Sequence, residues 1–235
     1  MSKLLIVESP SKAKTISNYL GSEYKVLASY GHIRNLLPKS EGINTENFEM
    51  NFQLIDRNKK HIDAISKAVK SSDEILLATD PDREGEAIAW HIVEILNTKK
   101  LTKNKKIARI IFGEITKGAI VDALKEPRDI SEALVHAQQA RQALDYLIGF
   151  NLSPLLWSKI RYGLSAGRVQ SPALRLITER EKEIQIFEKK EYWSIHLDTQ
   201  KENSKFTTKL VILENKKIEQ FTVTNEAKQK KLLES

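Results

Sequence analysis

Short apolar runs alternate with segments of helical periodicity along the first half of the chain. Four of these runs have the length and bulk that buried strands require. They are Leu4–Val7, Tyr24–Ser29, Ile75–Ala78 and Ile107–Phe112. Between them, residues 10–20, 61–70 and 88–96 carry apolar side chains at helical spacing. Strands that alternate with helices indicate an α/β fold, with a mainly parallel sheet covered by helices on both faces.

The polar stretches add boundaries to this pattern. Ser9 followed by Pro10 is typical of an N-cap and a first helical residue, and Gly21 is typical of a helix end. Residues 35–58 are polar and weakly periodic, which predicts an excursion or loop. Residues 97–106 are basic, and a solvated turn is favoured there over a nucleic-acid contact.

The character changes after Gly113, where helices follow one another. Residues 115–125 are periodic, Pro127 breaks the pattern, and Ser131 predicts the N-cap of a long helix. An alanine-rich apolar stripe is expected to face a core, and it consists of Ala133, Ala137, Ala140, Leu144 and Leu147. The polar side chains of the opposite face are Gln138, Arg141, Gln142 and Asp145. That face is either plain surface or one side of a groove for a nucleotide backbone.

Two Ser-Pro pairs follow. Ser153–Pro154 predicts the start of a short helix, and Ser171–Pro172 predicts a further helix that ends near Ile186. From Tyr192 the apolar positions alternate and predict antiparallel strands, a new structural unit, before a last helix at residues 226–235.

Composition sets limits on the class of protein. The chain has 235 residues, a mass of 26.8 kDa and no cysteine, which excludes disulfides and thiolate metal sites. No run has the length of a membrane span and residues 1–20 lack a secretory layout, so we expect a soluble intracellular protein. The net charge of +7 favours a polyanionic partner only weakly, because lysine-rich surfaces are common.

Three acids on alternate residues follow the third apolar run. Asp80, Asp82 and Glu84, with Arg83 among them, lie between the expected strand and the helix that begins near Gly85. One acid there is explained by helix capping. Three acids repel one another unless a cation lies among them, and hard oxygen ligands favour Mg²⁺. A magnesium site at the carboxyl end of the strand is therefore the favoured interpretation.

The first strand is followed by an acid in the same way. If the two strands are parallel neighbours, Glu8 converges with Asp80 and Asp82 on one crevice; otherwise Glu8 is a solvated loop residue. Lys12 lies in the first turn of the next helix, where a cation is disfavoured unless an anion such as phosphate is close. His32 is a metal ligand, a phosphate contact or a surface residue.

The loop at residues 160–172 has features of a nucleic-acid contact. Gly163 and Gly167 allow a close approach of the backbone. Polar donors suited to phosphates and base edges come from Ser165, Arg168 and Gln170, and Trp157 is available for stacking.

Four segments together resemble bacterial topoisomerase I, a member of the type IA DNA topoisomerase family. They are residues 8–16 (Glu-Ser-Pro-Ser-Lys-Ala-Lys-Thr-Ile), 31–34 (Gly-His-Ile-Arg), 80–86 (Asp-Pro-Asp-Arg-Glu-Gly-Glu) and 163–171 (Gly-Leu-Ser-Ala-Gly-Arg-Val-Gln-Ser). The acidic segment alone is less specific, because primases and related nucleases share this Toprim module. The segments at 8–16 and 163–171 remove most of that ambiguity.

The resemblance implies a fold and a division into three parts. A Toprim metal-binding domain at 1–113 would precede a helical single-stranded-DNA-binding domain at 114–188 and the incomplete start of a β arch domain at 189–235. It also implies a cytoplasmic, nucleoid-associated monomer that binds a single-stranded segment of negatively supercoiled duplex and relaxes it. In this family a tyrosine breaks one strand through a 5′-phosphotyrosine link, the other strand passes, and the ends rejoin.

The resemblance also assigns roles to residues. The catalytic residues would be Glu8, Lys12 and Arg83, and Mg²⁺ would be bound by Glu8, Asp80, Asp82 and Glu84. The positions that match the single-stranded DNA path are His32, Arg141, Gln142, Asp145, Phe150, Trp157, Ser165, Ala166, Gly167, Arg168, Val169 and Gln170.

Two departures from the family pattern matter. Gln142 and Tyr146 stand where relatives commonly carry arginine, which puts part of the phosphate contact in doubt. The Tyr-x-Arg-Thr-Asp-Ser type of segment that holds the nucleophile is absent, so we expect an N-terminal piece that alone neither nicks nor relaxes DNA. The alternatives are a Toprim nuclease or primase fragment and a non-catalytic single-stranded-DNA-binding module.

Overall fold

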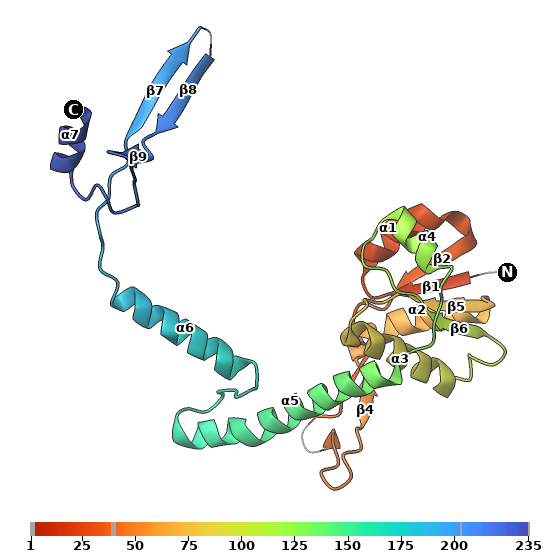
Figure 1. The fold of residues 1–235 in the computed structure, drawn as a ribbon. Coiled ribbons are helices and arrows are strands. Elements are labelled where there is room, and N and C mark those ends of the chain that lie inside the picture. The colour runs from red at the N-terminus through yellow and green to blue at the C-terminus, as the bar shows by residue number, and fades with distance from the viewer. Residues whose placement is uncertain (1–2, 39–40, 203, 235) are drawn as a thin grey trace. The chain divides into compact units, whose positions relative to one another are not determined.

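A four-stranded parallel sheet lies at the centre of the first part of the chain (Figure 1). Its strands, in the spatial order β2-β1-β5-β6, are β1 (Lys3–Val7), β2 (Tyr24–Ala28), β5 (Glu74–Leu77) and β6 (Lys106–Arg109). The computed structural model describes residues 3–38, 41–202 and 204–234. The expected parallel sheet is confirmed, although β6 ends at Arg109 rather than at Phe112.

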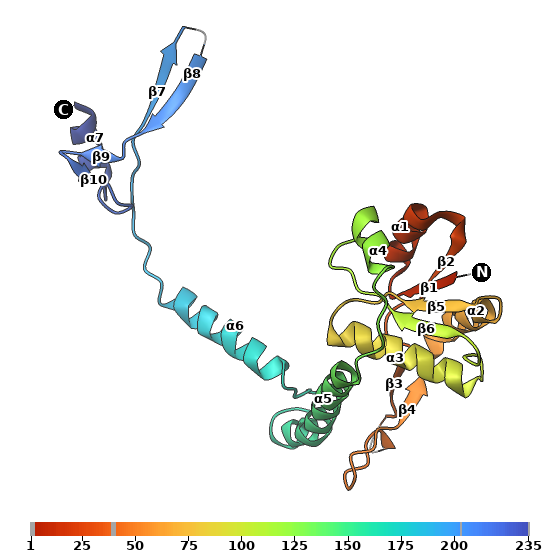
Figure 2. The same ribbon diagram turned by 45° about the vertical axis from the view of Figure 1, so that its right-hand side comes forward.

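Helices cover both faces of this sheet, because its strands are apolar on both sides. Leu4, Ile6 and Leu77 pack against α2 (Lys59–Lys70) and α3 (Arg83–Thr98). On the other face, Leu5, Val7 and Leu76 pack against α1 (Pro10–Leu20) and α4 (Lys117–Ala123). Figures 1 and 2 show the two helix pairs on opposite sides of the strands. The alternation of side-chain direction along each strand produces this double-sided core.

The predicted start of α1 is confirmed in detail. The backbone N–H of Lys12 donates to Ser9 Oγ at 3.2 Å, and Pro10 occupies the first turn, where its missing N–H costs nothing. The helix stops at Gly21, whose φ of +67° is the left-handed value that glycine adopts easily. A short 3₁₀ turn, η1 (Gly21–Glu23), then leads into β2.

The prediction of an irregular loop at residues 35–58 is wrong in part. Two short antiparallel strands, β3 (Arg34–Leu36) and β4 (Phe52–Leu54), form a hairpin there, followed by a 3₁₀ turn, η3 (Asp56–Asn58). Strands of three residues give too little alternation to be recognised from sequence. The hairpin is held instead by packing, since the ring of Phe52 meets Trp90 of α3 edge-on, with ring centroids 6.3 Å apart.

A buried histidine lies in the same packing contact. His91 of α3 is 1% exposed, and its ring meets Phe52 and Trp90 at centroid distances of 4.8 Å. Burial is the main cause that lowers the pKa of His91 to about 3, and the positive charges of Arg34 and His32 add to it. His91 is therefore neutral in the folded chain at physiological pH.

We expect this histidine to make the fold sensitive to mild acid. Between about pH 6.5 and pH 3 the unfolded chain binds a proton at this residue that the folded chain does not, so stability falls as the pH falls. Between about pH 7.5 and about pH 5.5, His91 should cost roughly 1.4 kcal/mol of unfolding free energy. Urea denaturation followed by circular dichroism should show this extra loss in the wild type and not in His91→Leu. Equal losses in both proteins would contradict the assignment.

The long helix α5 (Glu132–Lys159) differs from the prediction in two ways. Ser131 caps it as expected, but the helix continues through Pro154, so no new helix begins at Ser153. A proline removes one backbone donor and does not always end a helix. The expected apolar stripe is also wrong, because Ala133, Ala137 and Ala140 are exposed. The buried residues of α5 are Val135 and Gln138, on the polar face, and that face packs on α3.

Residues 172–235 form a second compact unit, separate from the unit of residues 1–171. After α6 (Gln170–Gln185), β7 (His196–Lys201) and β8 (Ser204–Lys209) pair as an antiparallel hairpin, as predicted. The short strands β9 (Ile212–Leu213) and β10 (Lys216–Lys217) pair next, and α7 (Glu226–Glu234) closes the described chain. Boundaries at 113 and 188 remain predictions. No helix of the described residues is long and apolar enough to cross a membrane.

Candidate metal and nucleic-acid site

The topology brings the carboxyl ends of β1 and β5 together. From β1 the chain crosses through α1 to β2 on one side, and from β5 it crosses through α3 to β6 on the other side. The strand order therefore reverses between β1 and β5, which is the place where open α/β sheets bind ligands. Ile6 is paired with Leu77 in register. Glu8 and Asp80, which follow these strands, emerge at the same edge of the sheet.

A lysine joins these two acids. Lys12 Nζ is 2.9 Å from Glu8 Oε1 and also contacts Asp80 Oδ1. Lys12 is the third residue of α1, so its cation sits near a helix N-terminus that disfavours positive charge. The two carboxylates of the chain itself balance this charge, and contact of Lys12 with a phosphate remains a prediction. The convergence of Glu8 with Asp80 across 72 positions is confirmed.

The pKa values of the two carboxyl groups are shifted in opposite directions. Burial raises the pKa of Glu8, and the neighbouring Asp80 raises it further, while Lys12 opposes both. A hydrogen bond from Glu8 lowers the pKa of Asp80, and Lys12 and Arg109 favour its charged form as well. Of the two carboxyl groups, Glu8 is therefore the weaker acid and Asp80 the stronger one.

We define the acid turn as residues 78–82. The surroundings of Asp82, in this turn, and of Arg83, which follows it, differ from those of Asp80. Asp82 caps α3, because its Oδ1 accepts the backbone N–H of Gly85 at 2.8 Å. The capping role that one acid was expected to fill thus belongs to Asp82, whose second oxygen makes no hydrogen bond with the described residues. Arg83 is exposed, and its guanidinium makes no hydrogen bond or ion pair within the described chain.

Glu84 is held from two sides. Its Oε2 lies 3.2 Å from His32 Nε2, on the loop after β2, and 3.3 Å from Gln138 Nε2 of α5. Gln138 is 5% exposed, and its Oε1 has no hydrogen-bond partner among the described residues. His32 is thereby placed beside the predicted metal ligands, and α5 is placed beside the acid turn.

The chemistry of these donors fits a hard divalent cation, although their arrangement differs from a complete metal site. Glu8 and Asp80 supply adjacent carboxylates. The ammonium of Lys12 already lies between them, which shows that a positive charge is favourable in that position. Among the residues that the structure describes, no group of three or more acids or histidines lies close enough to hold a metal ion. Binding of Mg²⁺ by Glu8, Asp80, Asp82 and Glu84 therefore remains a prediction.

The second group of predicted residues gathers on the C-terminal half of α5. Asp145 binds Arg168 through two hydrogen bonds of 2.8 and 3.0 Å, and its Oδ2 lies 3.8 Å from Arg141 Nε. The bond from Arg168 is the main cause that lowers the pKa of Asp145. Gln142 Nε2 donates to Asn35 Oδ1 at 3.1 Å, so the hairpin braces the same helix.

The loop of residues 163–169 folds back onto this half of α5. Trp157 Nε1 donates to the carbonyl of Leu164 at 2.5 Å, and the N–H of Ala166 donates to Ser153 Oγ at 3.1 Å. Gln170 Nε2 lies 3.4 Å from Ser165 Oγ. Gly163 has a φ of +85°, which explains why a glycine stands at this turn. These bonds hold the loop against α5, and Arg168 of the loop contacts Asp145.

Large apolar groups are exposed on the same surface. Phe150 and Tyr146 have parallel rings with centroids 6.3 Å apart, and the hydroxyl of Tyr146 donates to the carbonyl of Leu37. Phe150, Trp157 and Val169 are 48%, 39% and 60% exposed. Exposed rings on a helix that also carries an arginine, Arg141, suit the stacking of unpaired bases.

Sequence reasoning missed a buried charged network beneath the acid turn. Glu86 and Arg109 are both fully buried and joined at 3.1 Å, and Arg128 completes the network. A signal was present at one end of the network, because Arg109 interrupts the apolar run of residues 107–112. Charged residues at buried positions are almost always paired, so this interruption predicts a partner of opposite charge.

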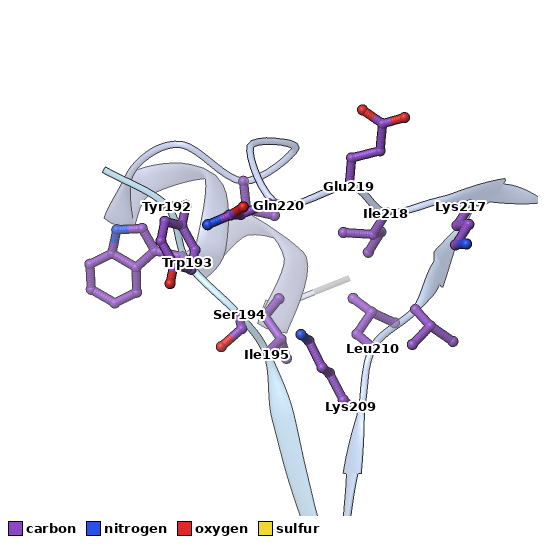
Figure 3. Close-up of a pocket in the computed structure, with 12 residues that line it drawn as sticks. Tyr192, Trp193, Ser194, Ile195, Lys209, Leu210, Lys217, Ile218, Glu219 and Gln220 are labelled. Carbon is purple, nitrogen blue, oxygen red and sulfur yellow. The ribbon is translucent and has the colours of Figure 1, made fainter. Parts of the chain in front are cut away.

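The second unit contains a pocket of about 420 Å³, which Figure 3 shows. Its lining includes Trp193, Ile195 and Leu210, with the side chains of Lys209 and Glu219 at its edge. No residue predicted from sequence to bind metal or DNA lines this pocket.

Comparison with known proteins gives a consistent picture. The family model described as "Toprim domain" matches residues 3–115, and the one described as "DNA topoisomerase" matches residues 129–235. The DNA topoisomerase 1 of Xylella fastidiosa (strain Temecula1) is 60% identical over 223 residues, which are 94% of this chain and 27% of that relative. The DNA topoisomerase 1 of Rickettsia felis is 53% identical over 236 residues, 99% of this chain and 30% of that relative.

A solved structure agrees with these relatives. The full-length topoisomerase I of Thermotoga maritima matches 97% of this chain and 37% of its own, with a TM-score of 0.66 and 40% sequence identity. The chain therefore spans less than a third of the length of the two curated relatives and little more than a third of the solved structure.

Proposed function

Because this chain belongs to the DNA topoisomerase I family, whose N-terminal part it matches, we propose that it is the metal- and DNA-binding part of a type IA enzyme. The parent enzyme would relax negatively supercoiled DNA by transient single-strand breakage, strand passage and rejoining. The observation that carries the proposal is the meeting of Glu8, Lys12 and Asp80 at the edge of the sheet, beside the polar face of α5.

Glu8 is suited to moving a proton. When the tyrosine oxygen of the parent enzyme bonds to phosphorus and the bond from phosphorus to the 3′ oxygen breaks, that oxygen needs a proton. The pKa of Glu8 is raised by burial and by Asp80, so Glu8 holds a proton at a higher pH than an ordinary glutamate does. Glu8 would give the proton during cleavage and take it back when the 3′ hydroxyl attacks during rejoining.

Lys12 and the acid turn would handle the charge of the phosphate. Lys12 lies within reach of both carboxylates, and its ammonium would offset charge that develops on the phosphate oxygens. Arg83 is exposed and would contact the same anion. Mg²⁺, held by Asp80 and Asp82 with Glu8 and Glu84, would supply further positive charge at the phosphate when bound.

The face of α5 and its loop would hold one DNA strand. The arginines at 141 and 168 are oriented by Asp145, and exposed rings follow along the helix at Phe150 and Trp157. Arginines oriented in this way bind phosphates, while the rings stack on unpaired bases. His32, Gln142 and residues 165–170 complete the proposed path, and the chain would act as a monomer in the cytoplasm, at the nucleoid.

The isolated chain is expected to bind single-stranded DNA but not to change the topology of a plasmid. The reason is that none of its tyrosines lies in the family's nucleophile segment. Incubation with negatively supercoiled plasmid and Mg²⁺, followed by gel electrophoresis with and without detergent, should show neither nicking nor relaxation. A fluorescent oligonucleotide should bind, and more weakly as salt rises. Relaxation by the chain alone, or no binding to the oligonucleotide at low salt, would contradict the proposal.

A second candidate is a DNA-binding module without catalysis, and two contacts favour it. Lys12 already bridges Glu8 and Asp80, and Asp82 caps α3, so all three acids have a structural use. This candidate predicts oligonucleotide binding that is indifferent to chelators. Cleavage of DNA without a covalent adduct would favour a Toprim nuclease instead.

A further inference from the structure

A fully buried glutamate connects two parts of the proposed site. Glu86 lies one turn into α3, with its side chain 0% exposed. Its carboxylate makes contacts in two directions, toward the acid turn through Arg109 and toward α5 through Arg128 and the backbone of Ser131. These contacts satisfy both carboxylate oxygens.

The first branch reaches the backbone of the acid turn. Arg109 Nε donates to Glu86 Oε2 at 3.1 Å. The rest of the guanidinium donates to backbone carbonyls, at 2.7 Å to Thr79 and at 3.1 Å to Leu77, and it also bonds the carbonyl of Asp80. Arg109 therefore fixes the backbone from the end of β5 to the residue that carries the Asp80 carboxylate.

The second branch reaches the start of α5. Arg128 donates to both oxygens of Glu86, at 2.9 and 2.8 Å, and the backbone N–H of Ser131 donates to Glu86 Oε1 at 2.6 Å. Ser131 is the N-cap of α5, and its Oγ accepts the N–H of Leu134. The first turn of α5 is therefore attached to the same carboxylate as the acid turn.

The charge of Glu86 is required by this arrangement. Burial by itself would raise the pKa of Glu86, but hydrogen bonds from Arg128, Ser131 and Arg109 lower it below the ordinary value. A buried ion pair often contributes little to net stability, because apolar residues could fill the same space. What apolar residues could not do is hold two backbone segments through directed hydrogen bonds.

We propose that Glu86 is a positioning residue, which fixes the acid turn through Arg109 and the first turn of α5 through Arg128 and Ser131, so that the carboxylates and the DNA-binding helix keep one relative placement. The role in catalysis rests on the proposed function. The physical link between the two segments does not depend on it.

Hydrogen exchange of backbone amides tests this link in the intact chain. Glu86→Gln should speed exchange about tenfold or more at two separate places, because one carboxylate serves both segments. These places are the amides of Gly85 and Glu86, which bond to Asp82, and the amides of Leu134 and Val135, which bond to Ser131. The amides inside β1 should be unchanged.

Controls separate positioning from loss of stability. Lys125→Gln removes an exposed charge whose partner is Asp122 of α4 and should leave all of these amides unchanged. If Glu86→Gln does not fold, Arg109→Lys is the second variant, because it keeps the charge opposite Glu86 and loses the fork of donors. Arg109→Lys should speed exchange at Gly85 and Glu86 and leave Leu134 and Val135 less affected.

The outcomes divide clearly. Faster exchange at both segments with β1 unchanged supports the proposal, whereas no change, or an equal increase throughout the sheet, overturns it. Titration of Mn²⁺ into Glu86→Gln and Arg109→Lys should show an affinity about tenfold lower than that of the wild type. A loss of this size is typical when the hydrogen-bond partners of metal ligands are removed. If the wild type bound no Mn²⁺, the proposed metal function would fail, while the exchange result would still decide the positioning role.

Discussion

Gly85→Ala is expected to displace the acid turn and to lower the unfolding free energy by roughly 2–4 kcal/mol. A Cβ at this position would collide with the carbonyl oxygen of Asp80 and would lie 2.7 and 2.8 Å from the backbone N and C atoms of the same residue. Backbone atoms cannot rotate away as the end of a side chain can. The turn that carries the Asp80 carboxylate would have to move, and affinity for Mg²⁺ should fall about tenfold or more.

The chain provides a matched control for this glycine. Gly118 is also helical, in α4, and a Cβ there would meet nothing within 4 Å. Gly118→Ala should stabilise the chain by about 0.5–1 kcal/mol, because alanine is the better helix former. Chemical denaturation and calorimetry of both variants would measure the two effects. A Gly85→Ala variant with normal stability and normal metal affinity would show that the turn does not need this close approach.

The double variant Asp80→Asn with Asp82→Asn is expected to abolish measurable Mg²⁺ binding and to retain the fold. Asparagine is as good an N-cap as aspartate, so Asn at position 82 can still accept the N–H of Gly85. Asn at position 80 keeps an oxygen for Lys12. The change therefore removes two negative charges with little change in shape, and hard cations depend on that charge.

Calorimetric titration would measure the affinity of the double variant for Mg²⁺. Fluorescence polarisation of a labelled oligonucleotide in the presence of chelator would measure its affinity for DNA. DNA binding should change little, because most of the proposed path runs along α5 and its loop. If the double variant bound Mg²⁺ as well as the wild type does, the acids of this turn would be structural and the non-catalytic module would become the better account.

The elements that the sequence predicts well are those with a strong local pattern. Apolar runs of four residues marked β1 and β5, and Ser9-Pro10 placed the start of α1 to the residue. The meeting of Glu8 with Asp80 was predictable as well, because the acids follow strands of the same kind and parallel neighbours end at one edge.

The orientation of α5 was not predictable from its own residues. Its alanine stripe and its polar face are both plausible contact surfaces, and the structure buries Val135 and Gln138 rather than the alanines. The deciding contacts come from residues distant in sequence, such as the bond of Gln138 with Glu84 and that of Gln142 with Asn35. A single helix carries no information about such partners.

The buried network of Glu86 lies between these two cases. An arginine inside an apolar strand run indicates a buried partner, yet only the folded structure shows that Glu86 provides it. The role of Asp82 was likewise ambiguous, since a cap and a metal ligand need the same side chain at the same position.

Glu8 and Asp80 are expected to belong to one metal site. The most direct test of this expectation is calorimetric titration of Mg²⁺ into Glu8→Gln, with Glu23→Gln, in an exposed 3₁₀ turn, as the control. Glu8 follows a different strand from the one that precedes Asp80, and the two residues meet only through the fold. If the carboxyl ends of β1 and β5 form a single metal site, Glu8→Gln should bind Mg²⁺ about tenfold or more weakly than the wild type, and Glu23→Gln should bind normally. Unchanged affinity in Glu8→Gln would contradict the account.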